Sequence, residues 1–590
     1  MICESDMERK QLTVQETPDS VIAANPRQKI EISKLHGKIS RICLYDGIKW
    51  NELMPTSRFA GDSWELPVKA FKVVSKDPQC LQIEITRADD FWRFQTRYEI
   101  YPSGYLVCSI EIEACKTQAF PQPLSVDIPL AEHPVFTHSY TTVNLVNDPG
   151  DRRSFRAFGV DFSTDFRPIT GSVNLLMEQV ARGMQGRPQS KEIIDEEQAR
   201  VLRWNLSDPR LNPLPKGYRY ENRWALTVTT IANDINPVRG QRIYHWYGRF
   251  PRYPADDLID EMAEYGCSIF ILHMPVFTHI TGSDPADANE MKRVVNRSHG
   301  LGMKVLFYCV PQLVSINAPY HDEYKGSRTE NLRIWHSLKD TQIVFYEEDD
   351  NYDCDELCIR CPDAYEFIYQ SVLKCFTTYD FDGIYVDFAW PVAGLCSDPT
   401  HDHQQGIFNF YDYWRMLRGW RKELGDSALM IGHGGGLLVS SDFVEGFDAC
   451  LTGEAQRELN PREIGQQIGT APTLWAMHRR KQEVFRSAWT IPQLVREGMT
   501  PHTGLGVLGT SVLASFDPAH HKELLPLWQM WRSFPIERAR VYTYLHPGIL
   551  EIDNREVWYT LFVTDDPYYL LILSNAGGPY HDANPAVSAN

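Results

Sequence analysis

The segment FDGIYVDFAW, residues 381–390, has the pattern of a buried parallel β-strand that ends in a carboxylate. Side chains alternate along a strand, so Ile384 and Val386 are expected on one face and Tyr385 and Asp387 on the other. An aspartate at the end of an otherwise apolar strand is costly to bury without a role. Asp387 is therefore the first candidate for a functional residue.

Short apolar strands that alternate with amphipathic helices continue on both sides of this segment. The strands are expected at 242–248, 268–274, 304–310, 383–389, 428–433 and 448–454, with weaker candidates at 487–491 and 504–510. Apolar residues recur at helical spacing in three intervening sets: Leu258, Ile259, Met262 and Tyr265; Ile368, Val372 and Cys375; Ile407, Tyr411, Trp414 and Leu417. Repeated strand–helix units predict a (β/α)8 TIM barrel over 237–537, with an open doubly wound sheet as the alternative.

Both flanks of the barrel have β patterns. Residues 29–236 alternate polar and apolar side chains, as in LVCSIEIEA at 106–114, and predict an N-terminal β-sandwich domain after a loose lead-in over 1–28. The Pro-Ser-Gly sequence at 102–104 is expected to form a hairpin turn. EVWYTLFV and YYLLILSN predict a C-terminal β-sandwich over 538–590, which is short for a complete domain of that kind.

The composition restricts the partners and the compartment. The 590 residues carry a formal net charge of −18, which repels phosphate backbones and makes nucleic acid an unexpected partner. The first twenty residues contain no apolar run, so no signal peptide is expected, and no stretch is apolar enough to predict a membrane-spanning helix. The 13 cysteines have no regular spacing across the chain, which favours reduced thiols and a cytoplasmic location.

The predicted catalytic residues are two carboxylates at strand ends. In a barrel of this kind the active residues come from the C-terminal ends of the strands. Asp387 ends the fourth expected strand and Glu454 ends the sixth. A glycosidase needs one carboxyl group to attack or stabilise the sugar and another to protonate the leaving oxygen. Asp387 and Glu454 are the predicted pair, while Glu445 and Asp448 compete with Glu454 but fall nearer the start of their strand.

FDGIYVDFAW resembles the fourth-strand nucleophile segment of retaining α-glycosidases with barrels, such as the α-galactosidases and endo-α-N-acetylgalactosaminidases. The resemblance implies that Asp387 is the nucleophile and Glu454 the acid/base. RYEIYPSGYLVCSIEIEA, at 97–114, is similar to the β-supersandwich that precedes the barrel in many of these enzymes. One position departs from the pattern: α-galactosidases have Lys two residues before the aspartate, and this chain has Tyr385.

Further polar and aromatic residues at or after strand ends are candidates for sugar binding. They could stack on a sugar ring or donate hydrogen bonds to its hydroxyls, and they are His245, Trp246, His273, Trp390 and His433. The three glycines after His433 lack the spacing of a phosphate loop, so no nucleotide site is expected.

Cys354, Cys358 and Cys361 have the C-x3-C-x2-C spacing of radical S-adenosylmethionine enzymes. In that family the motif follows the first barrel strand, whereas here three expected strands precede it. The cysteines end an acidic segment, EEDDNYDCDELCIRC, which leads into a helix expected to begin at Pro362. A solvated loop is the prediction, and a zinc site that lacks a fourth ligand or an iron–sulfur cluster is the alternative. No metal or cofactor is therefore assigned.

These patterns predict a glycosidase that cleaves an O-glycosidic bond with retention, through a covalent glycosyl-enzyme. The resemblance implies an α-linked galactoside, N-acetylgalactosaminide or glucoside as substrate. Two alternatives from other classes stay open: a non-catalytic carbohydrate-binding barrel and a radical enzyme that uses the three cysteines.

Overall fold

The computed structural model divides the chain into two compact units. One comprises residues 1–143, 157–230 and 406–408, and the other comprises residues 144–156, 231–405 and 409–590. The structure describes residues 11–26, 28–45, 50–55, 57–117, 124–131, 135–141, 159–166, 169–177, 191–196, 199–205, 213–230, 240–246, 251–273, 276–278, 284–315, 318–327, 354–387, 400–401, 403, 410–433, 447–452, 483–486, 510–514, 528–543, 549–553, 557–566, 568–575 and 587–589.

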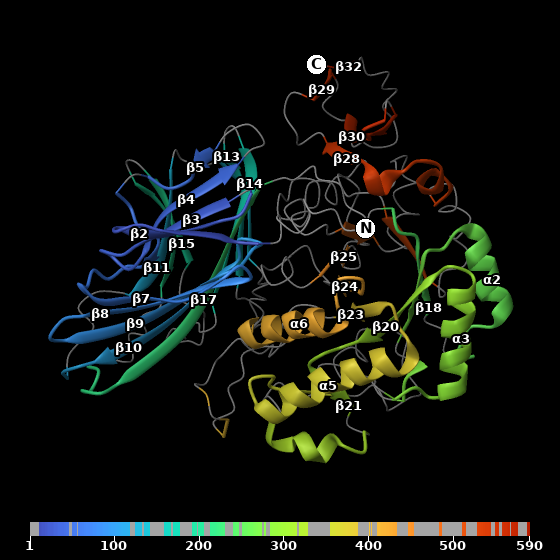
Figure 1. Ribbon diagram of the computed structural model, residues 1–590, viewed down its shortest axis with the longest axis horizontal. Helices are drawn as coiled ribbons and strands as arrows, with labels where there is room; N and C mark the ends of the chain where they lie inside the picture. Colours follow the sequence, from blue (N-terminus) through green and yellow to red (C-terminus); the bar gives the residue numbers. More distant parts are fainter. Residues whose placement is uncertain are drawn as a thin grey trace, which may run out of the picture. The chain divides into compact units, whose positions relative to one another are not determined.

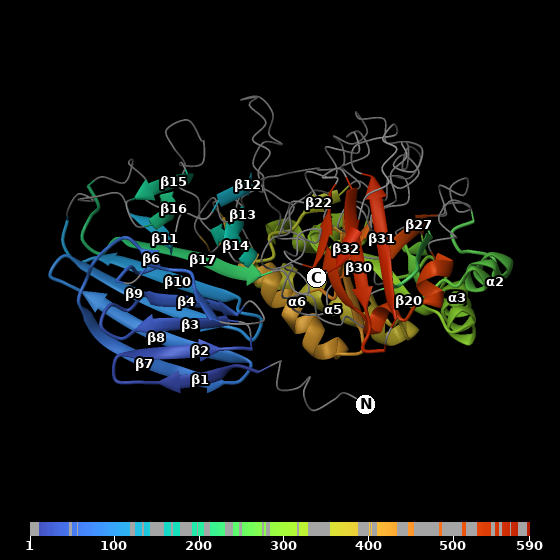
Figure 2. The same cartoon turned by 90° about the horizontal axis from the view of Figure 1, so that it is seen from above.

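The first unit contains three sheets (Figures 1 and 2). The five-stranded antiparallel sheet contains, in order, β1 (Thr13–Glu16), β2 (Ser20–Ala24), β3 (Gln28–Ser33), β4 (Ile39–Tyr45) and β5 (Trp50–Glu52). Strands β1 and β2 lie within the segment expected to be a loose lead-in. A short polar strand such as TVQE carries no strong periodic signal. The pairing of β1 with β2, and of β2 with β3, decides their conformation.

The eight-stranded sheet has the order β12-β13-β14-β17-β10-β9-β8-β7. Its strands are β7 (Val68–Asp77), β8 (Cys80–Ala88), β9 (Trp92–Ile100), β10 (Leu106–Ala114), β12 (Val135–Thr141), β13 (Gly159–Phe166), β14 (Ile169–Met177) and β17 (Arg219–Thr230). The third sheet orders β15 (Lys191–Glu196), β16 (Ala199–Asn205), β11 (Ser125–Ala131) and β6 (Gly61–Asp62). Buried and exposed side chains alternate along most of β9, as the period-two pattern predicts.

The predicted hairpin turn joins β9 and β10. The Gly104 amide donates to the Tyr101 carbonyl at 2.8 Å, and the Tyr101 amide donates to the Tyr105 carbonyl at 2.9 Å. Gly104 has a φ of 84°, a conformation that favours glycine. The turn at 102–104 is therefore confirmed.

The second unit contains a closed barrel of eight parallel strands. In chain order these are β18 (Ile243–Trp246), β19 (Ile269–Leu272), β20 (Lys304–Cys309), β23 (Gly383–Val386), β24 (Leu429–His433), β25 (Ala449–Thr452), β26 (Glu483–Arg486) and β27 (Thr510–Ala514). Strand β27 pairs with β18, so the sheet closes on itself, which an open doubly wound sheet does not do.

Six of the barrel strands fall within the segments expected for them, and two do not. Strand β26 lies at 483–486 rather than 487–491, and β27 begins at Thr510, where the expected segment 504–510 ends. Short apolar runs are ambiguous without their partners. Parallel pairing of Ala449 with Glu483, and of Phe485 with Thr510, fixes the positions of these two strands.

Four helices are described among the barrel connections: α2 (Asp256–Tyr265), α3 (Ala288–Gly300), α5 (Pro362–Tyr379) and α6 (Phe410–Leu424). Helix α2 packs against α3, α3 against α5, and α5 against α6, so successive helices are neighbours (Figure 1). The predicted apolar faces of α2, α5 and α6 are confirmed at Ile259, Val372 and Trp414, which are buried. Ile407, expected in the third set, lies outside the described residues.

The segment that leads into β23 has little freedom. Helix α5 begins at Pro362 as expected and ends at Tyr379, and the C-cap residue Asp380 has a φ of 57°, which turns the chain out of the helix. The Asp382 amide then donates to the Val305 carbonyl at 2.9 Å. A Cβ at Gly383 would lie 2.0 Å from the Leu429 carbonyl oxygen of the neighbouring strand, so only glycine fits there.

The C-terminal strands form two small sheets, β28 (Arg540–Thr543) with β30 (Val557–Val563) and β31 (Tyr569–Asn575), and β29 (Leu550–Ile552) with β32 (Val587–Ala589). Strands β30 and β31 lie within the two strand segments expected here and pair antiparallel. Their core contains Trp531, Ile536, Ala539, Phe562 and Ile572. The helical residues 528–533, which contribute Trp531 to this core, lie at the expected end of the barrel.

Within the described ranges, none of the helices has both the length and the apolar character that crossing a membrane requires. The nine cysteines whose side chains are described form no disulfide.

Candidate active site

Asp387 follows the last residue of β23, at the C-terminal end of the barrel strand, and its side chain is half-buried. Its amide donates to the Cys309 carbonyl at 2.9 Å, which continues the ladder between β20 and β23 by one residue. Carboxylate oxygen Oδ2 accepts a hydrogen bond from the Tyr308 hydroxyl at 2.7 Å. The carboxylate is therefore anchored through its backbone and through one side-chain donor, both to the third barrel strand.

Tyr308 belongs to a group of rings under this carboxylate. Its ring centroid lies 3.9 Å from that of His273, which follows β19, and 5.9 Å from that of Tyr385 on β23. The His245 ring, on β18, meets Tyr385 edge-on at 4.5 Å. These four side chains come from the first four barrel strands and converge, so they point into the barrel interior.

All four rings are nearly inaccessible, with Tyr385 at 0% and His273 at 4% exposure. They form a packed layer of aromatic and imidazole groups, and Asp387 is the more exposed group beyond it. Polar groups in such a layer can fix the position of a carboxylate, because a buried hydroxyl or imidazole has few alternative partners.

Asp387 also affects the neighbouring thiol. The pKa of Cys309 is raised, first by its complete burial and then by the negative charge of Asp387. Cys309 is therefore a protonated structural thiol rather than a nucleophile, because the thiolate is the reactive form.

The sequence did not single out Tyr308. Tyr308 lies inside the expected strand 304–310, where a tyrosine is an ordinary strand residue. The alternation of side chains carries the missing signal, because Tyr308 pairs in register with Tyr385 and must point to the same face.

The remaining predicted site residues have different positions. Trp246 is buried, and its indole Nε1 donates to the Arg252 carbonyl at 2.7 Å. This hydrogen bond holds the connection that follows β18. His433 is the last residue of β24. Val386 of β23 pairs with Gly432 of β24, and the next residues along the two strands are Asp387 and His433.

Two of the predicted residues cannot be placed. Glu454 and Trp390 lie outside the described residues, as does Glu445.

Asp448, the competitor of Glu454, has a structural role. It precedes β25, accepts hydrogen bonds from the Met430 amide at 2.8 Å and from the Arg421 guanidinium, and its own amide donates to the Met430 carbonyl. These contacts tie the start of β25 to β24 and to helix α6. Asp448 therefore lies at the opposite end of the strand from the one that bears active residues in such barrels.

At Cys358 the described end of the cysteine segment is buried rather than solvated. Cys358 is 0% exposed, and its sulfur lies 3.3 Å from His403 Nε2. His401 completes a group of three side chains that could hold a metal ion. The expectation of solvation rested on the acidic residues before Cys358, whereas pairing of β21 (Leu313–Ser315) with β22 (Cys354–Glu356) brings the end of the segment inside.

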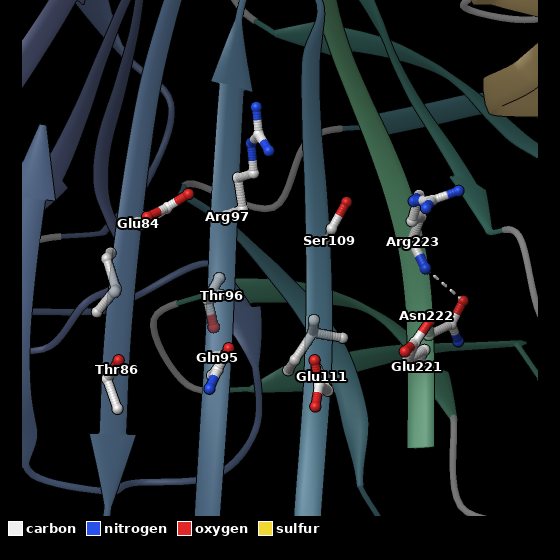
Figure 3. Close-up of a pocket in the computed structure, with 12 residues that line it drawn as sticks. Glu84, Thr86, Gln95, Thr96, Arg97, Ser109, Glu111, Glu221, Asn222 and Arg223 are labelled. Carbon is white, nitrogen blue, oxygen red and sulfur yellow. Dashed lines mark hydrogen bonds between the residues drawn. The ribbon is translucent and has the colours of Figure 1, made fainter. Parts of the chain in front are cut away.

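A hollow of about 290 Å³ lies on the eight-stranded sheet of the first unit (Figure 3). Its lining includes Glu84, Arg97, Ser109 and Arg223 on four neighbouring strands, where Glu84 is paired with Arg97 and Arg97 with Ser109. Opposite charges directly across a pair of strands stabilise a sheet. Pairing of Glu84 with Arg97 therefore accounts for the charged residues in this hollow, and no ligand is needed to explain them. None of the predicted site residues lines it.

Three solved structures resemble the chain over most of its length. The galactosidase domain of the α-galactosidase-sucrose kinase AgaSK is 10% identical and matches 95% of this chain and 91% of that chain, with a TM-score of 0.52. A variant of the GH36 α-galactosidase AgaA from Geobacillus stearothermophilus, in complex with raffinose, gives the same identity and coverage with a TM-score of 0.53. AgaB from the same organism is also 10% identical and covers 93% of this chain and 91% of its own, with a TM-score of 0.52.

No protein-family model matches the chain, and no curated protein matches its sequence. At 10% identity the structural likeness establishes the fold. The chain therefore shares the fold of the GH36 α-galactosidases, as the resemblance of its fourth barrel strand implies.

Proposed function

We propose that the protein is a glycoside hydrolase that cleaves α-linked galactosides with retention. The observation that carries the proposal is the carboxylate of Asp387 at the C-terminal end of β23, held by Tyr308 at 2.7 Å above a layer of inward-pointing rings. Active sites of such barrels lie at this end of the strands. The fold shared with α-galactosidases adds an argument by analogy.

In the proposed reaction the Asp387 carboxylate attacks the anomeric carbon, and the bond from that carbon to the leaving oxygen breaks. Glu454, which follows β25 by two residues, donates its proton to the leaving oxygen. Glu454 then takes a proton from water, whose oxygen attacks the same carbon and releases Asp387. Two carboxyl groups that act in this way lie about 5–5.5 Å apart.

Tyr308 is the proposed positioning residue for the nucleophile. Its hydroxyl donates to Oδ2, so the attacking carboxylate keeps one orientation and loses less freedom when the substrate arrives. His245 and His273 belong to the packed layer below, and we propose that they act with Tyr308 to hold the base of the sugar site. Trp390, His433 and Trp246 are proposed as further contacts to the sugar.

The similar solved structures indicate which sugars to test first, and Tyr385 is the position where this chain departs from the α-galactosidase pattern. AgaA structures hold raffinose and stachyose, so α-galactosides of this kind are the first substrates to test, before α-N-acetylgalactosaminides and α-glucosides. Tyr385 occupies the position where the α-galactosidase pattern has lysine, and its ring faces His245. Because Tyr385 is fully buried in the ring layer below Asp387, the chain offers no cation to the sugar at this position.

A panel of aryl α- and β-glycosides tests the proposal, with the first-formed anomer of any cleaved sugar followed by proton NMR. We expect an α-galactoside to be hydrolysed and the α-anomer to appear first. Asp387→Asn should lose this activity, while Asp382→Asn, at the other end of the same strand, should keep it. Binding of raffinose without hydrolysis of any glycoside would instead support a non-catalytic carbohydrate-binding barrel. Appearance of the β-anomer first would refute retention.

A further inference from the structure

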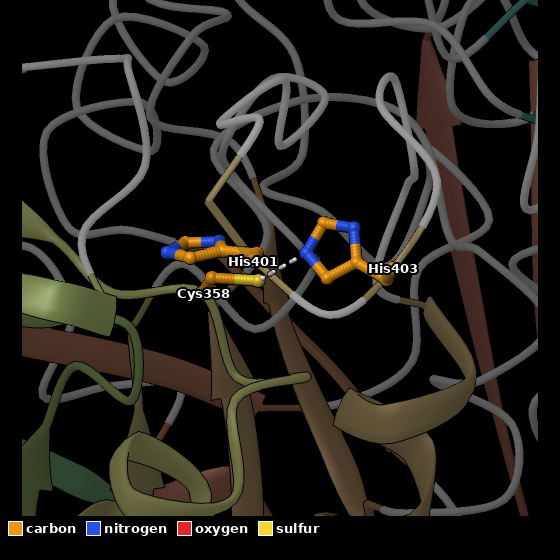
Figure 4. A group of neighbouring side chains, drawn as sticks. All are labelled: Cys358, His401 and His403. Carbon is orange, nitrogen blue, oxygen red and sulfur yellow. Dashed lines mark hydrogen bonds between the residues drawn. The ribbon is translucent and has the colours of Figure 1, made fainter.

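Cys358, His401 and His403 bring three metal-binding atoms together in the second unit (Figure 4). One ligand atom from each side chain lies within 4.8 Å of the others. Cys358 and His401 are buried, and His403 is half-buried. The three residues come from two connections that are far apart in sequence, so the fold and not a local motif assembles them.

The distance between sulfur and imidazole fits a shared ion. Cys358 Sγ and His403 Nε2 lie 3.3 Å apart. In a tetrahedral zinc site, Zn–S is about 2.3 Å and Zn–N about 2.0–2.1 Å, which places neighbouring sulfur and nitrogen ligands about 3.5 Å from each other. The pair is therefore within a few tenths of an ångström of the separation that zinc requires.

The hydrogen bond of His401 orients its ring for coordination. His401 Nε2 lies 2.9 Å from the Gly326 carbonyl oxygen. A carbonyl can only accept, so Nε2 carries the hydrogen and the lone pair of the neutral ring is on Nδ1. Metal-binding histidines usually donate their other ring N–H to a carbonyl or carboxylate in this way, which fixes the tautomer.

The backbone holds the cysteine in place before any ion arrives. The Cys358 amide donates to the Ser327 carbonyl at 2.7 Å, and the Cys361 amide donates to the Cys358 carbonyl at 2.9 Å. Ser327 ends the 3-10 helix η2 (His321–Ser327), and Cys361 immediately precedes helix α5. Cys358 is thus fixed between two helical elements, and little rearrangement is needed to present its sulfur.

We propose that Cys358, His401 and His403 bind one Zn²⁺ ion, with water or a further protein group in the fourth position. Thiolate and imidazole ligands suit zinc and do not suit Mg²⁺ or Ca²⁺, which take oxygen ligands. Binding converts the Cys358 thiol to a thiolate, and the proton passes to solvent.

The ion would be structural. Cys358 lies in the connection that follows the third barrel strand, and the two histidines follow Asp387 by 14 and 16 positions in the connection after the fourth. Zinc at this position ties together two connections from the strands that hold Tyr308 and Asp387. The site is independent of the glycosidase proposal, because its assignment uses none of the catalytic groups.

The test begins with the metal itself. The purified full-length chain is stripped with a chelator, dialysed, and titrated with Zn²⁺ in competition with a chromophoric zinc indicator, and the metal content is then measured by mass spectrometry. We expect about one zinc per chain. Replacement by Co²⁺ should give a thiolate-to-cobalt charge-transfer absorption, which reports a bound cysteine sulfur. A chain that takes up no zinc in this titration would overturn the proposal.

Variants then assign the ligands. Cys358→Ser and His403→Ala should each weaken zinc binding by at least roughly 100-fold, more than the loss usually caused by changes outside the ligand set. Cys361→Ser is the matched control, because Cys361 lies three residues away but is not among the three grouped side chains. Circular dichroism checks each fold, and His403→Ala carries the test if Cys358→Ser does not fold. Unchanged binding in both ligand variants, or loss only in Cys361→Ser, would refute the assignment.

Discussion

Strand β23 has an aspartate at each end, and the two are held in different ways. Asp382, before the strand, accepts the Val305 amide at 2.7 Å and lies 2.8 Å from His299 Nε2. Asp387, after the strand, accepts a hydrogen bond from the Tyr308 hydroxyl at 2.7 Å. One carboxylate thus completes the backbone hydrogen bonding of the adjacent strand, and the other is oriented by a ring in the barrel interior.

The arrangement at Asp382 recurs at Asp448. Each aspartate precedes a barrel strand, accepts an amide from the previous strand, and returns its own amide to the carbonyl of that same residue, Val305 or Met430. The repetition indicates that an aspartate at this end maintains the register between neighbouring strands. The carboxylate of Asp387 follows its strand and lies at the end of the barrel that bears active residues.

The largest expected effect is on catalysis by Asp387→Asn. The amide keeps the size of the carboxylate but removes its negative charge, so kcat on an active α-glycoside should fall by roughly 10⁴-fold or more. The melting temperature should change by only a few degrees, because the amide oxygen of asparagine can still accept a hydrogen bond from the Tyr308 hydroxyl. Initial rates and thermal unfolding measure both. Wild-type rates in this variant would exclude Asp387 as the nucleophile.

The opposite pattern is expected for Asp382→Ala. The Val305 amide loses its acceptor, and leaving a buried donor unsatisfied costs about 1–3 kcal/mol. Denaturant unfolding should report this loss of stability, while kcat of the folded fraction should stay near the wild-type value. A variant with full stability and lost activity would reverse the roles assigned to the two ends of β23.

An intermediate effect on activity is expected for Tyr308→Phe. A hydrogen bond to a charged group contributes about 1.5–3 kcal/mol, so kcat/KM should fall by about 10–100-fold. The decrease should be in kcat rather than KM, since the hydroxyl positions the nucleophile. Tyr244→Phe, which removes a hydroxyl elsewhere on the barrel, is the control and should leave kcat unchanged. Equal losses in both variants would indicate a packing effect only.

The smallest expected effect concerns Cys309, the thiol beside Asp387. Burial and the neighbouring negative charge raise its pKa, so at pH 8 it should react with iodoacetamide far more slowly than Cys80, which is partly accessible. Peptide mass spectrometry of briefly labelled native protein measures the two rates. Asp387→Asn removes the negative charge but leaves Cys309 buried, so Cys309 should still react slowly with iodoacetamide. Rapid labelling in the native state would show that the barrel interior opens.

The sequence predicted those elements whose pattern is local. The apolar run before Asp387 and the helical spacing of Ile368, Val372 and Cys375 correspond to β23 and α5. The predicted positions of β26 and β27 were wrong. Pairing with neighbouring barrel strands fixes where these two strands lie, and their own residues carry no pattern that does so.

The same limit applies to the candidate sites. Asp387 could be found because it ends an apolar strand, but its hydrogen bond to Tyr308 spans 79 positions. The contact of Cys358 with His403 spans 45 positions. The spacing of the three cysteines suggested partners within one loop, whereas the fold supplies two histidines from another. Contacts of this kind depend on the register of parallel strands, which a single sequence does not reveal.

The closure of the barrel has a consequence for biosynthesis. Ile243 of the first strand pairs with Val512 of the last, which is synthesised 269 residues later. At a translation rate of about 5–20 residues per second, the edge of β18 waits roughly 15–50 s for its partner. An unpaired strand edge can associate with other chains. Crowded expression at high temperature should therefore favour aggregation of nascent chains, and slower growth or a chaperone that shields this edge should raise the yield of soluble enzyme.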